Sequence, residues 1–111
     1  MRKVTYHIDD LAYFRRSWAK QANITEEQIS GILSGLEPFT AIYTLYGEKT
    51  NIDSYELTDV DGNKISINDL NGYQRGIILS DCMAHFEGHK NHDGEDEPFG
   101  VIEIEETEAA A

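Results

Sequence analysis

Residues 39–46 have the sequence FTAIYTLY, the clearest strand signal in the chain. Aromatic, β-branched and threonine side chains favour extended backbone, and apolar side chains fall on both alternating faces, as in an inner strand of a sheet. A turn at residues 47–51 then leads to a more polar strand at residues 52–59. The Asp-Gly pair within residues 60–63 supplies the positive φ angles of a tight hairpin turn, and a short strand at residues 64–67 follows. We therefore expect three neighbouring antiparallel strands.

The chain before this meander begins with one more strand and a helix. Residues 3–8 alternate between polar and apolar side chains, which is typical of a strand with one buried face. Asp9 or Asp10 is placed to cap the helix that follows, because an aspartate side chain accepts hydrogen bonds from free backbone N–H groups. The buried stripe of this helix is predicted to comprise Leu11, Phe14 and Trp18.

A second helix is predicted from its start signals. Thr25 and Gln28 have the spacing of a capping box. Ile24 and Ile29 flank the cap at the positions of a hydrophobic staple. Gly35 can adopt the left-handed conformation that ends a helix. The apolar face is expected to contain Ile29, Ile32, Leu33 and Leu36.

The last third of the chain predicts a third helix and a final strand. Asn68 or Asn71 can cap the helix, which we expect to run to about His89, and residues 99–105 alternate as a strand. The complete order, β-α-α-β-β-β-α-β, predicts an α+β fold. In it, an antiparallel sheet of four to five strands has helices packed on one face.

The length of 111 residues suits one domain. We expect a single α+β domain over residues 1–105 and a frayed, acidic and alanine-rich tail over residues 106–111. Cys82 is the only cysteine, so no internal disulfide can form and a reducing compartment is expected. The sequence has no apolar run of signal-peptide or membrane-span length. We therefore expect a cytoplasmic protein, in the host cytoplasm if the gene belongs to a phage.

The formal net charge of −12 is unevenly distributed. Residues 1–50 contain six acidic and six basic side chains, whereas residues 51–111 contain fifteen acidic and only three basic ones. A field of one sign repels the phosphates of nucleic acids and membranes and attracts basic surfaces. Direct binding of nucleic acid or of a membrane by the acidic half is therefore not expected.

These carboxylates are the first candidate binding site. If the last strand joins the sheet beside the middle hairpin, they form one continuous patch that could imitate DNA phosphates and occupy a basic groove of a nucleic-acid enzyme. The alternative is that they serve only solubility. The candidate partner-binding residues are Asp53, Glu56, Asp59, Asp61, Asp69, Asp93, Glu95, Asp96, Glu97, Glu103 and Glu105. Exposed aromatic side chains such as Tyr55 could anchor the contact.

In size, charge and lack of catalytic motifs, the chain is similar to small bacteriophage proteins that block host nucleic-acid enzymes, such as anti-restriction and anti-CRISPR inhibitors. This similarity is one of composition and transfers no residue. It implies a non-enzymatic inhibitor of a basic host protein. The alternative function is an adaptor or regulatory domain that binds a protein partner through an apolar patch, without mimicry.

A second candidate site consists of metal-ligand residue types close together in the sequence. On one continuous helix, spacings of three and four residues place side chains on the same face, where they could bind zinc and give a metal-stabilised domain. The opposing interpretation makes Cys82 an ordinary buried core residue. The candidate ligands are Cys82, His85, His89 and His92, with Asp93 or Glu95 able to complete the set.

Two further chemistries have weaker signals. Residues 59–63 (DVDGN) resemble the opening of a calcium-binding EF-hand loop, but Lys64 and Leu70 occupy the positions that require glycine and glutamate. Histidines near Cys82 could activate its thiol, although the acidic surroundings oppose this. Because the chain has no catalytic signature, we expect no enzymatic activity and no obligatory cofactor.

Overall fold

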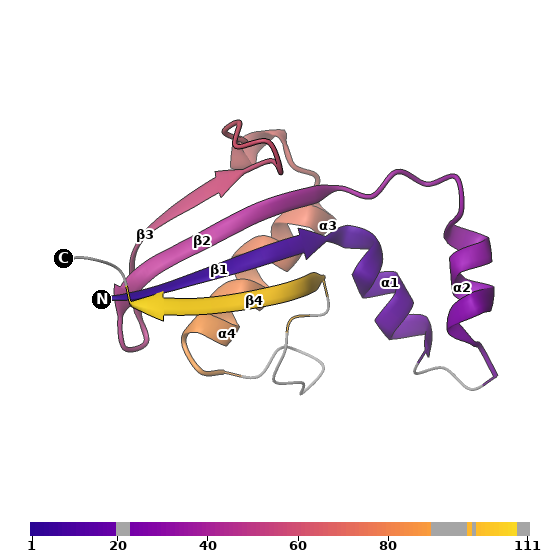
Figure 1. The fold of residues 1–111 in the computed structure, drawn as a ribbon, viewed down its shortest axis with the longest axis horizontal. Coiled ribbons are helices and arrows are strands. Elements are labelled where there is room, and N and C mark those ends of the chain that lie inside the picture. The colour runs from indigo at the N-terminus through magenta and orange to yellow at the C-terminus, as the bar shows by residue number, and fades with distance from the viewer. Residues whose placement is uncertain (20–22, 90–97, 99, 109–111) are drawn as a thin grey trace.

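The structure is a computed structural model that describes residues 1–19, 23–89, 98 and 100–108. Its centre is a four-stranded antiparallel sheet with strand order β3-β2-β1-β4 (Figure 1). The strands are β1 (Arg2–Asp9), β2 (Thr40–Glu48), β3 (Asn51–Thr58) and β4 (Val101–Glu108). The α+β class and the antiparallel sheet predicted from the sequence are confirmed.

The short strand expected at residues 64–67 does not belong to this sheet. Lys64 makes one isolated β-bridge, and the chain then enters a 3₁₀ turn, η1 (Ile67–Asp69). The Ser66 side chain caps this turn by accepting a backbone hydrogen bond. The cap directs the backbone away from the sheet and towards the next helix, so the sheet has four strands.

The described helices are two separate ones and a longer helical stretch. The two are α1 (Asp10–Ala19) and α2 (Glu26–Leu33), and the stretch comprises α3 (Gly72–Arg75), the π-helical segment η2 (Gly76–Cys82) and α4 (Met83–Phe86). The capping box predicted at Thr25 is present, and Asn71 starts the long stretch in the same way, its Oδ1 accepting from the Gln74 N–H at 2.8 Å. None of the described helices is long and apolar enough to cross a membrane.

The main core lies between the long helical stretch and one face of the sheet (Figure 1). Alternate side chains of β1 and β2 are buried there and pack against one side of the helix. The Arg2 guanidinium lies 4.4 Å from the centre of the Phe86 ring and covers the end of this core. The core residues of these three elements are Val4, Tyr6, Ile8, Ala41, Tyr43, Leu45, Ile77, Ile78, Cys82 and Phe86.

Helices α1 and α2 pack against each other beyond the ends of β1 and β2, and make a second, smaller core (Figure 1). Leu11, Ile29 and Leu33 are its buried residues, with Phe14 and Trp18 packed against them. The apolar face predicted for α2 was too wide, because Ile32 and Leu36 are 60% and 57% exposed. In the described part of the chain α2 packs mainly against α1, and this contact covers only a narrow stripe.

Strand β4 begins two residues later than predicted and ends three residues later. It continues to Glu108 because β1 begins at Arg2, which pairs with Glu108 and so provides backbone partners for the whole of β4. Arg2 also fixes this end of the strand through an ion pair of 2.5 Å between its Nε and Glu106 Oε1. Residues 106–108 are therefore strand and not tail, while residues 109–111 lie outside the described residues.

Candidate functional site

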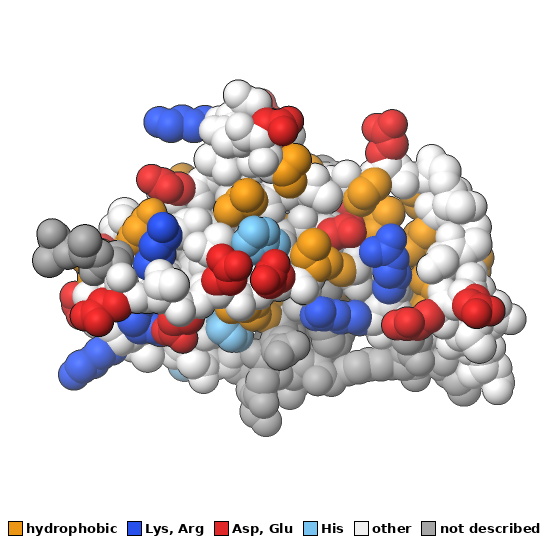
Figure 2. Space-filling model, in the orientation of Figure 1, with side chains coloured by type: hydrophobic (Ala, Val, Ile, Leu, Met, Phe, Trp, Pro, Cys, Tyr) orange, Lys and Arg blue, Asp and Glu red, His pale blue; other side chains and the backbone are white. Residues whose placement is uncertain are grey.

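The second face of the sheet is covered by none of the described helices, and we call it the open face. Its side chains alternate with those buried against the long helical stretch, since successive residues of a strand point to opposite faces. Figure 2 views the molecule from this side and shows acidic, histidine and apolar side chains close together over the sheet. The open face consists of Lys3, Thr5, His7, Ile42, Thr44, Tyr46, Ser54, Glu56, Thr58, Glu103, Glu105 and Thr107.

The strand register arranges these side chains in three rows across the sheet. The middle row runs Glu56, Thr44, Thr5, Glu105 and so has an acid at each edge. Neighbouring strands lie about 4.8 Å apart, so the backbones of these two acids are separated by about 14 Å. The two acids are exposed, whereas Thr44 between them is buried. The other rows run Ser54, Tyr46, Lys3, Thr107 and Thr58, Ile42, His7, Glu103.

The acids proposed from the sequence fall into two separate groups. Strands β3 and β4 form opposite edges of the sheet, because β1 and β2 lie between them. The condition for one continuous patch, that the last strand lies beside the middle hairpin, is therefore not met. The first group, on β3 and the segment after it, is Asp53, Glu56, Asp59, Asp61 and Asp69, and the second, on β4, is Glu103 and Glu105. Asp93, Glu95, Asp96 and Glu97 lie outside the described residues.

Asp59 has a local structural role in the turn after β3. Its Oδ1 accepts hydrogen bonds from the backbone N–H groups of Asp61 and Asn63, each at 2.9 Å. The hydrogen bonds from Asn63 are the main cause of the lowered pKa of the Asp59 carboxyl. The Asp59 carboxylate therefore stabilises this turn through local hydrogen bonds. This is a structural role, unlike the calcium binding that the resemblance of residues 59–63 to an EF-hand loop suggested.

Polar and aromatic contacts hold the open face in place between its acidic edges. The Tyr46 hydroxyl donates a hydrogen bond to Glu56 Oε2 at 3.4 Å, and the Thr44 hydroxyl donates one to Thr5 Oγ1 at 3.5 Å. Desolvation, together with the Glu56 charge and this hydrogen bond, raises the pKa of Tyr46. Lys3, the one Lys or Arg side chain on the open face, lies 5.9 Å from the Tyr46 ring centre. The middle of the face thus offers hydroxyl, aromatic and aliphatic groups.

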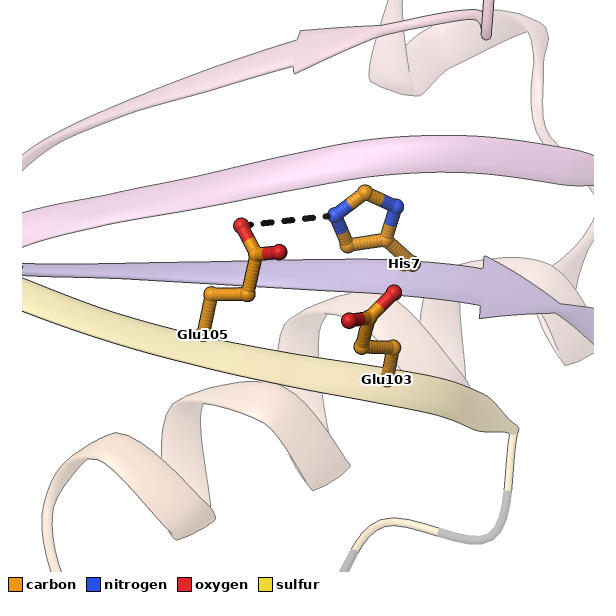
Figure 3. Close-up of side chains that lie close together, drawn as sticks. All are labelled: His7, Glu103 and Glu105. Atoms are coloured by element: carbon orange, nitrogen blue, oxygen red, sulfur yellow. Dashed lines mark ion pairs between the residues drawn. The ribbon is translucent and has the colours of Figure 1, made fainter.

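His7, Glu103 and Glu105 lie together on this face (Figure 3). One possible ligand atom from each side chain lies within 4.8 Å of the others. His7 Nε2 is 3.9 Å from Glu105 Oε2. Strand pairing produces the cluster, since His7 pairs with Glu103, and Glu105 is the next residue of β4 on the same face. The sequence analysis missed His7, because alternation placed it opposite the core but did not show that β1 pairs with β4.

The metal cluster proposed from the sequence is not assembled by its described members. Within the described residues, the set of three or more adjacent potential ligands is His7, Glu103 and Glu105, and it does not include Cys82, His85 or His89. Gly88, with a φ of 79°, ends the helical stretch before His89, whose side chain is 71% exposed. His92 lies outside the described residues.

Of the two inner members of that predicted cluster, Cys82 belongs to the core and His85 is partly buried beside it. Cys82 is fully buried, and burial, followed by the charge of Asp81, raises the pKa of its thiol. A thiol held in the protonated form is a poor nucleophile and a poor metal ligand. His85 Nδ1 is hydrogen-bonded to the buried Tyr6 hydroxyl at 2.9 Å, which holds the imidazole against the sheet.

Comparison of the chain with protein-family models, with curated proteins and with solved structures finds no match.

Proposed function

We propose that this chain is a small non-enzymatic inhibitor, whose open face binds a basic, nucleic-acid-binding groove of a host protein. The observation that supports it most is the middle row of the open face, which has Glu56 at one edge and Glu105 at the other. Their backbone separation of about 14 Å is on the scale of the roughly 12 Å width of a DNA major groove. The open face therefore carries negative charge at both edges, with Glu56 on β3 and with Glu103 and Glu105 on β4, and not as one continuous patch.

The spacing along the sheet supports the same proposal. Glu103 and Glu105 lie two residues apart on one face of β4, which separates their backbones by about 7 Å. Cationic side chains that follow a nucleic-acid backbone can therefore meet both carboxylates from one side. Charge complementarity of this kind steers association and is screened by salt.

The middle of the open face would supply the remaining contacts. Ile42 and Tyr46 are partly buried side chains between the acidic edges, and an aromatic residue with a polar end is a common energetic centre of protein interfaces. We expect Tyr46 to contribute apolar contact while Glu56 and Glu105 fix the orientation of the partner.

An adaptor domain without mimicry is the second candidate function. The observation in its favour is the exposure of Ile32 and Leu36 near the C-terminal end of α2, away from the open face. A partner that binds there would bury these side chains and would be insensitive to the carboxylates of the sheet.

Capture of a host protein, followed by a competition experiment, tests the proposal. The captured partner is purified and its affinity measured for the wild-type chain and for the variant Glu56→Gln/Glu103→Gln/Glu105→Gln, between about 50 and 500 mM salt. An exposed ion pair contributes about 0.2–1 kcal/mol to the binding free energy. The variant removes three carboxylates, so it should lose about 0.6–3 kcal/mol and bind about 3- to 150-fold more weakly. Duplex DNA or RNA should displace the chain from the partner.

The variant Glu26→Gln/Glu27→Gln/Glu37→Gln is the matched control, because it removes the same charge from exposed positions at and after α2. It should bind like the wild type. The inhibitor would be refuted, and the adaptor supported, by one pattern of results. In it, the affinity changes neither with salt nor in the open-face variant, but is lost in Ile32→Ser/Leu36→Ser.

A further inference from the structure

The cluster on strands β1 and β4 has the donor set of a metal site. His7 offers an imidazole nitrogen, and Glu103 and Glu105 offer carboxylate oxygens. Zinc binds these donors at about 2.0–2.2 Å, which places neighbouring ligand atoms of a tetrahedral site about 3.3–3.6 Å apart. The ligand atoms lie within 4.8 Å of one another, so small rotations of flexible side chains are enough to close the set around an ion.

The backbone holds the three donors on rigid elements. His7 and Glu103 are paired residues of adjacent antiparallel strands, and Glu105 is two residues further along the same face. The pairing of β1 with β4 is regular up to His7 and Glu103, and the register shift between the two strands follows only after His7. Donors on paired strands need little ordering when an ion binds, which favours binding relative to donors on loops.

The charges of the cluster also favour a cation. Two carboxylates on one face of β4 repel each other, and among the described ion pairs Glu105 is paired only with His7 while Glu103 has no pair. Calcium and magnesium prefer oxygen ligands throughout, so the imidazole selects transition metals.

We propose that His7, Glu103 and Glu105 form a binding site for a divalent transition-metal ion of the zinc class. Three protein ligands leave at least one coordination position for water or for a group supplied by another molecule. This inference goes beyond the proposed inhibitor, and it can be tested without any partner protein.

The test is a calorimetric titration of Zn²⁺ into the untagged chain, with absorption of bound Co²⁺ as a second readout. We expect one ion per chain with a Kd of about 1–100 μM, and at least a tenfold weaker Kd in His7→Gln. His89→Gln is the matched control, since His89 is an exposed histidine 3.9 Å from Glu87 and outside the cluster. It should bind like the wild type.

Circular dichroism establishes whether each variant is folded, and Glu105→Gln provides a second test if His7→Gln does not fold. The proposal is overturned if the wild type shows no saturable binding up to about 1 mM Zn²⁺. It is also overturned if folded variants of the cluster bind as tightly as the wild type, or if His89→Gln alone weakens binding. Glu103 and Glu105 also belong to the proposed partner-binding surface, but no partner is present in this titration, so it tests the metal site separately from the inhibitor proposal.

Discussion

Leu45→Ala and Ile42→Ala alter two side chains of the same inner strand that point to opposite faces of the sheet. Leu45 is 0% exposed and belongs to the core beneath the long helical stretch, whereas Ile42 lies on the open face and is partly exposed. Truncation of a buried leucine to alanine costs about 2–5 kcal/mol, because it removes apolar contact and leaves a cavity. Truncation of a side chain on an uncovered face leaves no cavity and costs about 1 kcal/mol.

Urea denaturation followed by circular dichroism measures both variants. With an m-value of about 1.5 kcal/mol/M, Leu45→Ala should lower the midpoint by about 2 M and Ile42→Ala by less than about 1 M. An equal loss of unfolding free energy in the two variants would mean that both faces of the sheet are covered. The open face would then not be available as a binding surface.

Three further changes test other contacts. Gly100→Ala should destabilise the chain by about 1–3 kcal/mol, because the added Cβ would lie 2.4 Å from Ile77 Cγ2. A melting temperature equal to that of the wild type would contradict this close approach. Thr25→Ala removes the capping box of α2 and should lower the free energy of unfolding, measured by urea denaturation, by about 0.5–2 kcal/mol. An unchanged free energy of unfolding would mean that the cap is not formed. Desolvation raises the pKa of Tyr6 and Tyr43 above the ordinary value of 10.0. Because the unfolded chain loses these protons first, the free energy of unfolding should be unaffected by them below about pH 10 and fall above it. A urea midpoint that stays constant between about pH 9 and 11.5 would contradict this.

Local signals in the sequence predicted local structure well. The capping box at Thr25 and the strand alternation before Asp9 depend on residues close in sequence, and the structure has both. The width of the apolar face of α2 was predicted less well. Its burial depends on how many neighbours α2 has, and Ile32 and Leu36 are exposed where they were expected to pack.

The arrangement of the candidate site depends on strand order, which no local pattern contains. One continuous acidic patch required β4 to lie near β3, but β1 and β2 lie between them and separate the two groups of acids. The same order brings His7 of β1 next to Glu103 of β4, two residues 96 positions apart in the sequence. A site made by pairing distant strands becomes visible only when the register is known.

The described members of the predicted zinc cluster do not come together, for a different physical reason. The expectation assumed one helix from about residue 71 to His89, but α4 ends at Phe86 and Gly88 has a φ of 79°. Cys82 and His85 then face the core, and His89 lies beyond the helix. Residue spacing alone therefore indicates neither where the helix ends nor which of its faces is turned towards the sheet.

Nuclear magnetic resonance titration of the ¹⁵N-labelled chain with its captured host partner tests the central claim most directly. We expect that the backbone signals that shift or broaden belong to the open face, including those of Thr5, Thr44, Glu56 and Glu105, and that about 500 mM salt abolishes the changes. Changes confined to α2 around Ile32, and persisting at high salt, would contradict it.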